Sequence, residues 1–459
     1  MSNISAVRKF EIAPDNQTSG NTTYSYRQGN PIITFSIAPQ EYYVRSKNLK
    51  LCFDVVLKDS AGNLPNNNDQ DGTGEREVRL NSRVGVASLF QQLEINNAMN
   101  QNLETIRHYG RLLASLLPSG SGWNEYTTYL SNEFGVSSNE QVQGRYLNRK
   151  MSVAMPLMAG IFLQGADIPL SMNNGVGGLN LKFSLQSSIQ ALYGSTATTP
   201  NSYYEITNVS LMGEYAMPKG GSLPAISSYP FSGFSSFYSV INNNDQTSQI
   251  NPALSAVVST FTNFLPTPHI SNYEEDAMKT TPLLNRNPAG GAYDLLAPIS
   301  KVSFMRGGVL FPLQFQVDEN EVIVRNPAVA DEWAGSSFDA QRQYYYAMSI
   351  RPRTSRATDQ LAGQNSENLP TANGDAQHNA VTEGIEGNVT PNGFQNVYGI
   401  GIRVGDMLGV GNTANFKNQA YSTRIISKLD GSSPMSSYTF FLYRSVINYD
   451  DRGLVSIVN

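Results

Sequence analysis

Apolar and polar residues alternate along much of this chain, and this alternation constrains its fold more than any other feature. The clearest run covers residues 49–57, with apolar side chains at Leu49, Leu51, Phe53, Val55 and Leu57. Residues 179–185 repeat the pattern with Leu179, Leu181, Phe183 and Leu185. A period of two places every second side chain on one face of a strand, so both runs predict sheets with one buried face.

The composition agrees with a protein built from sheets. Charged residues make up 15% of the 459 residues, against roughly 25% in ordinary soluble domains. Amides, hydroxyls and glycines replace them, with 24 Tyr and 20 Phe, and this mixture suits strands joined by tight turns. Further strand-like runs lie at 33–37, 84–95, 203–215, 234–241, 302–304, 313–317, 322–324, 344–350, 397–404, 438–443, 446–449 and 454–458. Roughly seven or eight strands in each half predict two β-sandwiches in tandem.

Two short segments have helical spacing instead. The first, residues 103–117, carries Leu103, Ile106, Leu113 and Leu117, and Pro118 follows it. The second carries Trp123, Tyr126, Leu130 and Phe134, with Ser121 as a possible cap. We expect both as short helices in a long excursion between two strands of the first sandwich.

Polar stretches and a Pro/Gly-rich stretch predict how the chain divides into domains and loops. Residues 1–28 are polar with little periodicity and predict an N-terminal arm that must dock to become ordered. Residues 218–224, Pro-Lys-Gly-Gly-Ser-Leu-Pro, predict a corner between domains. We therefore expect a first domain at 29–218 and a second at 219–459. Residues 353–392 lack aromatic and β-branched clusters and predict a long exposed loop.

Charge and hydropathy exclude several classes of protein. The 32 basic and 37 acidic residues give a net charge of −5, which argues against a surface that wraps nucleic acid. The longest apolar stretch, 153–163, is too short to span a bilayer, and residues 1–16 lack the pattern of a secretory signal. The single cysteine, Cys52, allows no internal disulfide and predicts a small buried side chain. We expect a soluble protein from a reducing compartment.

The residues that could carry chemistry do not form a recognisable site. The three histidines, His108, His269 and His378, lack the motifs of a triad or a metal cage. Residues 67–72 resemble the opening of a calcium loop, but Val78 stands where a bidentate Glu is required. We therefore predict no catalytic residue, no cofactor site and no metal site.

Two charged groupings leave alternatives open. Carboxylates cluster at Glu274, Glu275 and Asp276 and again at Asp318, Glu319 and Glu321, where a glycosidase pair could lie. Sugar subsites usually stack on aromatic rings, however, and Trp123 and Trp333 are the only tryptophans, which favours solvated turns. Arg351, Arg353 and Arg356 form a basic group that could meet phosphate or anchor the loop at 353–392.

The order of these segments resembles a known family. The stretches that carry the resemblance are 31–37 with 47–57, 88–96 running into 103–109, 168–170 with 178–185 and 204–215, and finally 438–443 with 451–457. In this order and spacing the chain resembles the double jelly-roll major capsid proteins of the tectivirus–adenovirus lineage, most closely those of polinton-like viruses and virophages. The resemblance extends from about residue 31 onwards and is weakest over 218–300.

The resemblance implies a fold and a function. The fold would be all-β, with two tandem eight-stranded jelly-roll sandwiches and short helices in the excursions between strands. The function would be that of a non-enzymatic capsid protein, located in the virion and made and assembled inside the host cell. Homotrimers with a pseudo-hexagonal outline would tile an icosahedral shell around a double-stranded DNA genome. Its partners would be further copies of itself, penton proteins and minor capsid proteins, without specific recognition of nucleic acid.

Two other classes of protein compete with this interpretation. The first is a carbohydrate-binding or carbohydrate-active β-sandwich, such as a viral receptor binder, which would need a cleft with paired carboxylates and stacked aromatic rings. The second is a surface-layer or fibre protein, which would associate in open arrays instead of closed trimers.

Overall fold

The computed structural model describes most of the N-terminal half and selected segments of the remainder. The described residues are 4–19, 22–64, 78–80, 84–120, 133–135, 150–163, 166–173, 175–193, 201–224, 226, 228–273, 277–278, 284–286, 293–295, 299–310, 399–403, 413–427, 434–449 and 455–458.

The first sandwich consists of two antiparallel sheets. One sheet has the order β1-β12-β4-β8 and is extended beside β12 by β3 and β9. Its strands are β1 (Ile4–Ile12), β3 (Tyr43–Val44), β4 (Lys50–Lys58), β8 (Met151–Pro156), β9 (Ile168–Pro169) and β12 (Tyr203–Pro218). The other sheet has the order β2-β10-β6-β7, formed by β2 (Ile32–Ile37), β6 (Phe90–Asn96), β7 (Asn102–Ile106) and β10 (Leu179–Leu185).

Aromatic rings join the inner faces of these two sheets. Phe53 of β4 contacts Phe90 of β6 edge to face, with 5.6 Å between ring centroids. Phe90 meets Phe183 of β10 in the same way at 5.6 Å, and Phe183 meets Phe35 of β2 at 6.3 Å. All four rings are at most 3% exposed. Burial of each contributes roughly 1.5–3 kcal/mol, so this group is a major source of cohesion in the sandwich.

The second sandwich is built in the same way. One sheet has the order β13-β22-β15-β20, with β23 also paired to β22, and the other has the order β14-β21-β18-β19. The strands are β13 (Ser228–Ile241), β14 (Asp245–Ile250), β15 (Val257–Pro266), β18 (Ile299–Arg306), β19 (Val309–Leu310), β20 (Gly399–Arg403), β21 (Tyr421–Ser427), β22 (Met435–Tyr449) and β23 (Val455–Val458). Between its sheets, the Thr260 hydroxyl donates to the Tyr421 hydroxyl at 2.9 Å, and the Tyr421 ring meets Phe441 at 5.2 Å.

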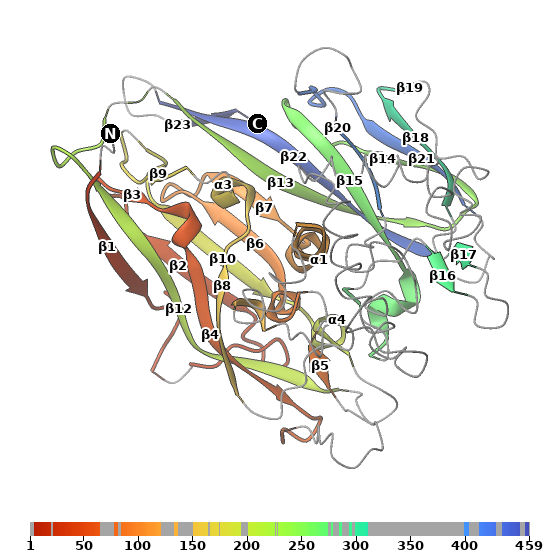
Figure 1. Ribbon diagram of the computed structural model, residues 1–459, viewed down its shortest axis with the longest axis horizontal. Helices are drawn as coiled ribbons and strands as arrows, with labels where there is room; N and C mark the ends of the chain where they lie inside the picture. The colour runs from red at the N-terminus through yellow and green to blue at the C-terminus, as the bar shows by residue number, and fades with distance from the viewer. Residues whose placement is uncertain are drawn as a thin grey trace, which may run out of the picture.

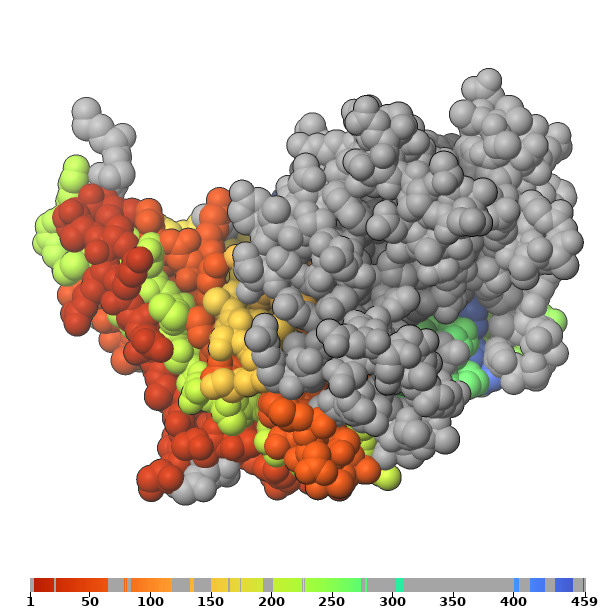
Figure 2. All heavy atoms as spheres, turned by 60° about the horizontal axis from the view of Figure 1, so that its bottom comes forward, coloured from red at the N-terminus to blue at the C-terminus, as the bar shows by residue number. Residues whose placement is uncertain are grey.

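Strand order identifies both sandwiches as jelly rolls. Among the described residues, the sheet strands of each sandwich pair in chain order as first-eighth-third-sixth in one sheet and second-seventh-fourth-fifth in the other. This order holds for β1 to β12 when β3 and β9 are left out, and again for β13 to β22. Alternate pairing of this kind is the jelly-roll topology of double-sheet β domains. The prediction of two tandem β-sandwiches is therefore confirmed, and we call them the first roll and the second roll. Figure 1 shows them side by side, and Figure 2 shows the first roll gathered on one side of the molecule.

Short elements complete the described chain. The helices are α1 (Tyr109–Gly120), α3 (Gly160–Leu163) and α4 (Ser188–Ala191), with 3-10 turns η1 (Ser46–Asn48), η3 (Val86–Leu89) and η4 (Thr267–Ser271). Two small ribbons pair β5 (Arg79–Leu80) with β11 (Leu192–Tyr193), and β16 (Leu284–Arg286) with β17 (Tyr293–Leu295). Within the ranges given above, no helix has the length and apolar character that a membrane crossing demands.

Three sequence expectations need correction. The arm expected at 1–28 contains β1, which is a regular strand of the first roll paired with β12. The helix expected at 103–117 begins only at Tyr109, because Leu103 and Ile106 belong to β7. The two strands expected at 438–443 and 446–449 are one continuous strand, β22.

Other expectations fall wholly or mostly outside the described residues. The strands expected at 313–317, 322–324 and 344–350 and the loop expected at 353–392 lie outside the described residues. Of the helix expected around Trp123, only residues 133–134 are described. We keep the domain division after residue 218 as a proposal, supported by the end of β12 at Pro218 and the start of β13 at Ser228.

Candidate functional site: the junction between the rolls

The two rolls meet in a buried junction rather than through a flexible tether. From the first roll come β7, α1 and α3, and from the second come β13, β15 and β22. The backbones touch where α3 crosses β13, because a Cβ atom on Gly160 would lie 2.6 Å from the Cα atom of Gly233. On the other side of Gly233, an added Cβ atom would lie 2.5 Å from the ring of Tyr443. Only glycine allows this close approach, so the spacing of the rolls is fixed.

A single carboxylate connects backbone groups from both rolls. Glu104 of β7 is fully buried, and its Oε1 accepts hydrogen bonds from the Gly160 N–H at 2.9 Å and from the Phe234 N–H at 2.7 Å. Its Oε2 accepts a third, from the Ile161 N–H at 3.1 Å. Burial raises the pKa of Glu104 from 4.5 to about 7, and the three N–H donors oppose this rise without cancelling it.

Further hydrogen bonds cross the junction on either side of Glu104. The Ser236 hydroxyl of β13 accepts from the Arg107 N–H at 3.0 Å, and the Tyr443 hydroxyl of β22 donates to the Leu103 carbonyl at 3.3 Å. The Asn263 amide of β15 donates to the hydroxyl of Ser115 in α1. Because these bonds involve β7, α1, β13, β15 and β22, neither roll can rotate against the other without breaking several of them.

His108 and Arg111 lie at the edge of this junction. His108 precedes α1, and its carbonyl accepts the bond from the Leu112 N–H at 2.9 Å that opens the helix. Its ring meets Tyr438 edge to face at 5.1 Å. Burial, followed by the charges of Arg111 and Arg107, lowers the pKa of His108 to about 4, so the ring is neutral at neutral pH. No group of three His, Cys, Asp or Glu side chains that could hold a metal occurs among the described residues.

The remaining candidate residues are scattered. His269 lies in η4, and Cys52 lies on β4, where it is half-buried rather than buried as expected. Burial is the main cause that raises the pKa of the Cys52 thiol. Outside the described residues are His378, both tryptophans, the calcium-like loop at 67–72, both carboxylate clusters and the three arginines Arg351, Arg353 and Arg356.

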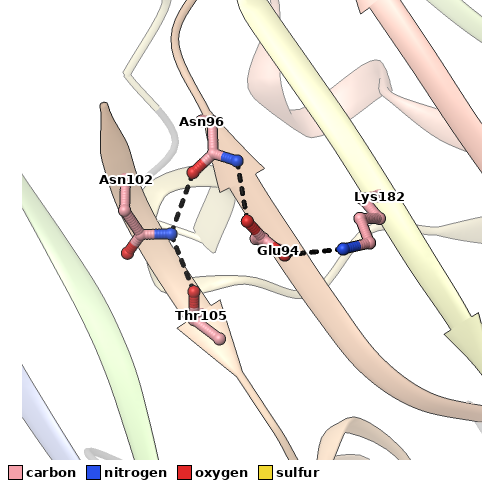
Figure 3. A network of polar contacts seen from close by, with 5 residues as sticks. All are labelled: Glu94, Asn96, Asn102, Thr105 and Lys182. Carbon is pink, nitrogen blue, oxygen red and sulfur yellow. Dashed lines mark hydrogen bonds and ion pairs between the residues drawn. The ribbon is translucent and has the colours of Figure 1, made fainter. Parts of the chain in front are cut away.

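The outer surface of the first roll carries networks of uncharged and paired polar groups. On β6 and β7, the Asn102 amide donates to Asn96 at 2.9 Å and to Thr105 at 2.7 Å, and Asn96 donates to Glu94 at 2.8 Å. Lys182 of β10 completes the row at 3.4 Å from Glu94, as Figure 3 shows. Each charge in the row has a partner, so this face presents hydrogen-bonding groups with little net charge.

A second polar cluster lies on the sheet that contains β4. The Asp54 carboxylate, 10% exposed, accepts from Lys150 at 2.8 Å, from Asn208 at 2.5 Å and from the Ser152 hydroxyl. Burial alone would raise the pKa of Asp54, but these hydrogen bonds outweigh it and hold the pKa below its ordinary value. Sequence reasoning missed both Asp54 and Glu104. For Asp54 the available signal was an acidic residue between Phe53 and Val55, whereas Glu104 lies in a strand with other polar residues and offered no such signal.

Comparisons with known proteins identify the fold. No protein-family model and no curated protein sequence matches the chain. Among solved structures, the Faustovirus major capsid protein matches with a TM-score of 0.56 and 10% identity, covering 96% of this chain and 90% of that one. A chain of the Sputnik virophage structure matches with a TM-score of 0.55 and 9% identity over 100% and 89%. PBCV-1 VP54, as fitted into a reconstruction of Sputnik, matches with a TM-score of 0.53 and 11% identity over 99% and 96%. The chain therefore has the double jelly-roll fold found in viral major capsid proteins, as its sequence suggested.

Proposed function

We propose that this protein is the major capsid protein of a DNA virus. The observation that carries the proposal is the presence of two rolls of the same topology in one chain, fixed side by side by a buried junction. Two similar blocks in a rigid unit supply two near-equivalent edges to an assembly. Three such subunits in a closed ring present six edges, and a hexagonal outline tiles a surface with one kind of subunit.

In this proposal, homotrimers tile an icosahedral shell around a double-stranded DNA genome. The protein is located in the virion and assembles inside the host cell. Its partners are its own copies, with penton and minor capsid proteins at other positions of the shell. The role is structural and not enzymatic, and it needs no cofactor and no specific recognition of nucleic acid.

The surface chemistry supports self-association. The network of Figure 3 consists largely of amide and hydroxyl groups with little net charge. Burying such a surface between two subunits therefore costs little free energy of desolvation. In the part of the chain that the structure describes, β1 pairs only with β12, so its other edge has unpaired N–H and C=O groups. Soluble proteins usually cover or protect such an edge, and contact with a neighbouring subunit is one way to do so.

Native mass spectrometry and electron microscopy test this function. We expect a particle of three times the 50.2 kDa chain mass and class averages with a six-cornered outline of threefold symmetry. With 15% charged residues, the trimer should survive moderate salt, because few ion pairs hold it. A stable monomer, or a ring with an even number of subunits, would contradict the proposal.

The carbohydrate alternative makes a different prediction for the same sample. A carbohydrate-binding or carbohydrate-active sandwich protein would retain labelled glycans on an array as a monomer. None of the similar structures reported above favours this alternative. Glycan binding without trimer formation would replace the capsid proposal.

A further inference from the structure

One buried positive charge at the junction has an unsatisfied hydrogen-bonding atom. Arg111 of α1 is 5% exposed, and its Nη2 atom has no hydrogen-bond partner among the residues that the structure describes. The guanidinium carbon lies 4.5 Å from the ring centroid of Tyr438, so the aromatic face compensates part of the charge. No ion pair among the described residues includes Arg111. A buried guanidinium has five N–H donors and normally meets an anion, but the described residues supply none to Arg111.

Beside Arg111 there is a cavity large enough for such an anion. Its volume is about 250 Å³, and it lies between α1 of the first roll and β13 and β22 of the second. Ligand pockets for drug-sized molecules usually have about 300–1,000 Å³, so this cavity suits a small ion with its water. Tyr238, which lines the cavity, is 46% exposed, so the cavity can be reached from solvent.

The chemistry of the cavity wall fits an anion. Besides Arg111 and His108, the wall carries the amides of Gln91, Gln186 and Gln190. Amide and imidazole N–H groups can donate to an oxyanion, and guanidinium groups bind carboxylate and phosphate through paired N–H donors. None of the described residues that line the cavity is acidic. A cation would therefore be repelled by the charge of Arg111 without a described carboxylate to balance it, whereas an oxyanion would meet a positive charge and several donors.

We propose that this cavity is a binding site for a small oxyanion, inorganic phosphate or a small carboxylate, which pairs with Arg111 and bridges the two rolls. The bound ion supplies the acceptor that Nη2 lacks. It also links α1 to the walls formed by β13 and β22, and so stabilises the relative orientation of the rolls. This site does not depend on the capsid role, because it is a property of the single chain.

Thermal unfolding and calorimetry test the site with three sodium salts at equal ionic strength: phosphate, acetate and chloride. We expect phosphate, acetate or both to raise the unfolding midpoint with saturation, while chloride does not, because an anion that binds only the folded state stabilises it. A response to phosphate alone assigns a phosphate, and a response to acetate alone assigns a carboxylate. Absence of any specific response, and of heat on titration, overturns the proposal.

Two variants separate binding at the cavity from general salt effects. Arg111→Met keeps an unbranched side chain without the guanidinium, and it should weaken binding at least tenfold. Arg424→Gln removes an exposed arginine that already pairs with Asp245 at 2.5 Å, and it should bind as the wild type does. If Arg111→Met fails to fold, Gln91→Leu tests the same wall from an exposed position. Equal anion affinity in the wild type and in the cavity variants overturns the proposal.

Discussion

Replacement of Glu104 by Gln tests the junction most directly, because only the wild-type side chain titrates. The carboxyl group has a pKa of about 7 in the folded protein and an ordinary value of 4.5. Between these values the folded state holds a proton that the unfolded state has released. The free energy of unfolding therefore falls as the pH rises through this window. At about 1.4 kcal/mol per pKa unit, the loss amounts to about 3 kcal/mol.

The glutamine variant has no such titration at this position. At acidic pH both side chains are neutral, but an amide nitrogen cannot accept a hydrogen bond, so one of the three N–H groups loses its acceptor. We expect Glu104→Gln to be less stable than the wild type there by about 1–3 kcal/mol. As the pH rises, the wild type alone loses stability. The deficit of the variant should therefore close or reverse.

Chemical denaturation followed by circular dichroism measures this difference at about pH 4, about pH 6 and about pH 8. Other titrating groups cancel when the two proteins are compared at each pH. Glu11→Gln, at an exposed position of β1, is the matched control for the loss of a carboxylate and should change the free energy of unfolding little. A difference between wild type and Glu104→Gln that stays constant with pH would refute the raised pKa. A deficit that grows with pH would show that the three N–H donors outweigh burial.

Three further predictions concern other parts of the molecule. Asp54→Asn should lower the free energy of unfolding by about 1.5–3 kcal/mol at neutral pH. Because the pKa of Asp54 is lowered in the folded state, this deficit should disappear as the pH falls below 3.8. A deficit that persists in acid contradicts this account. Gly233→Ala should cost about 1–3 kcal/mol because the added Cβ atom meets the Tyr443 ring, whereas Ser235→Ala on the same strand should change the denaturation midpoint little. Leu113→Asp places an unpaired charge at a fully buried position of α1, so soluble yield should collapse, and an unchanged melting temperature would show that α1 is not packed as described.

The sequence predicts strands well where one face of the strand is buried and the other is exposed to solvent. Residues 49–57 and 179–185 alternate because the sandwich core covers one face only, and β4 and β10 lie where these patterns indicate. The pattern fails for β7, because its pairing with β6 shifts register between Ile95 and Asn96, and this irregularity leaves Leu103 and Glu104 as adjacent buried residues. It fails for β1 for a different reason, since most of its residues are exposed on both faces.

The junction was beyond sequence reasoning for a related physical cause. Glu104 gains its importance from Gly160 and Phe234, which are distant in the chain and are brought together only when both rolls have formed. Arg111 likewise has a helical neighbourhood of ordinary apolar residues, and only the fold shows that its charge is buried. Local patterns report which face of an element is covered, but they do not report what covers it.

The position of β22 in its sheet sets an order of events during synthesis. β22 pairs with β13 from Met435 to Asn448 and, on its other edge, with β15 and β23. It nevertheless leaves the ribosome after every other described strand of the second roll except β23. The first roll has all its strands once β12 is complete at Pro218. A nascent chain therefore carries a finished first roll beside an open second one. Because β22 also brings Tyr438 and Tyr443 to the junction, the paired block exists only when translation of this strand is finished.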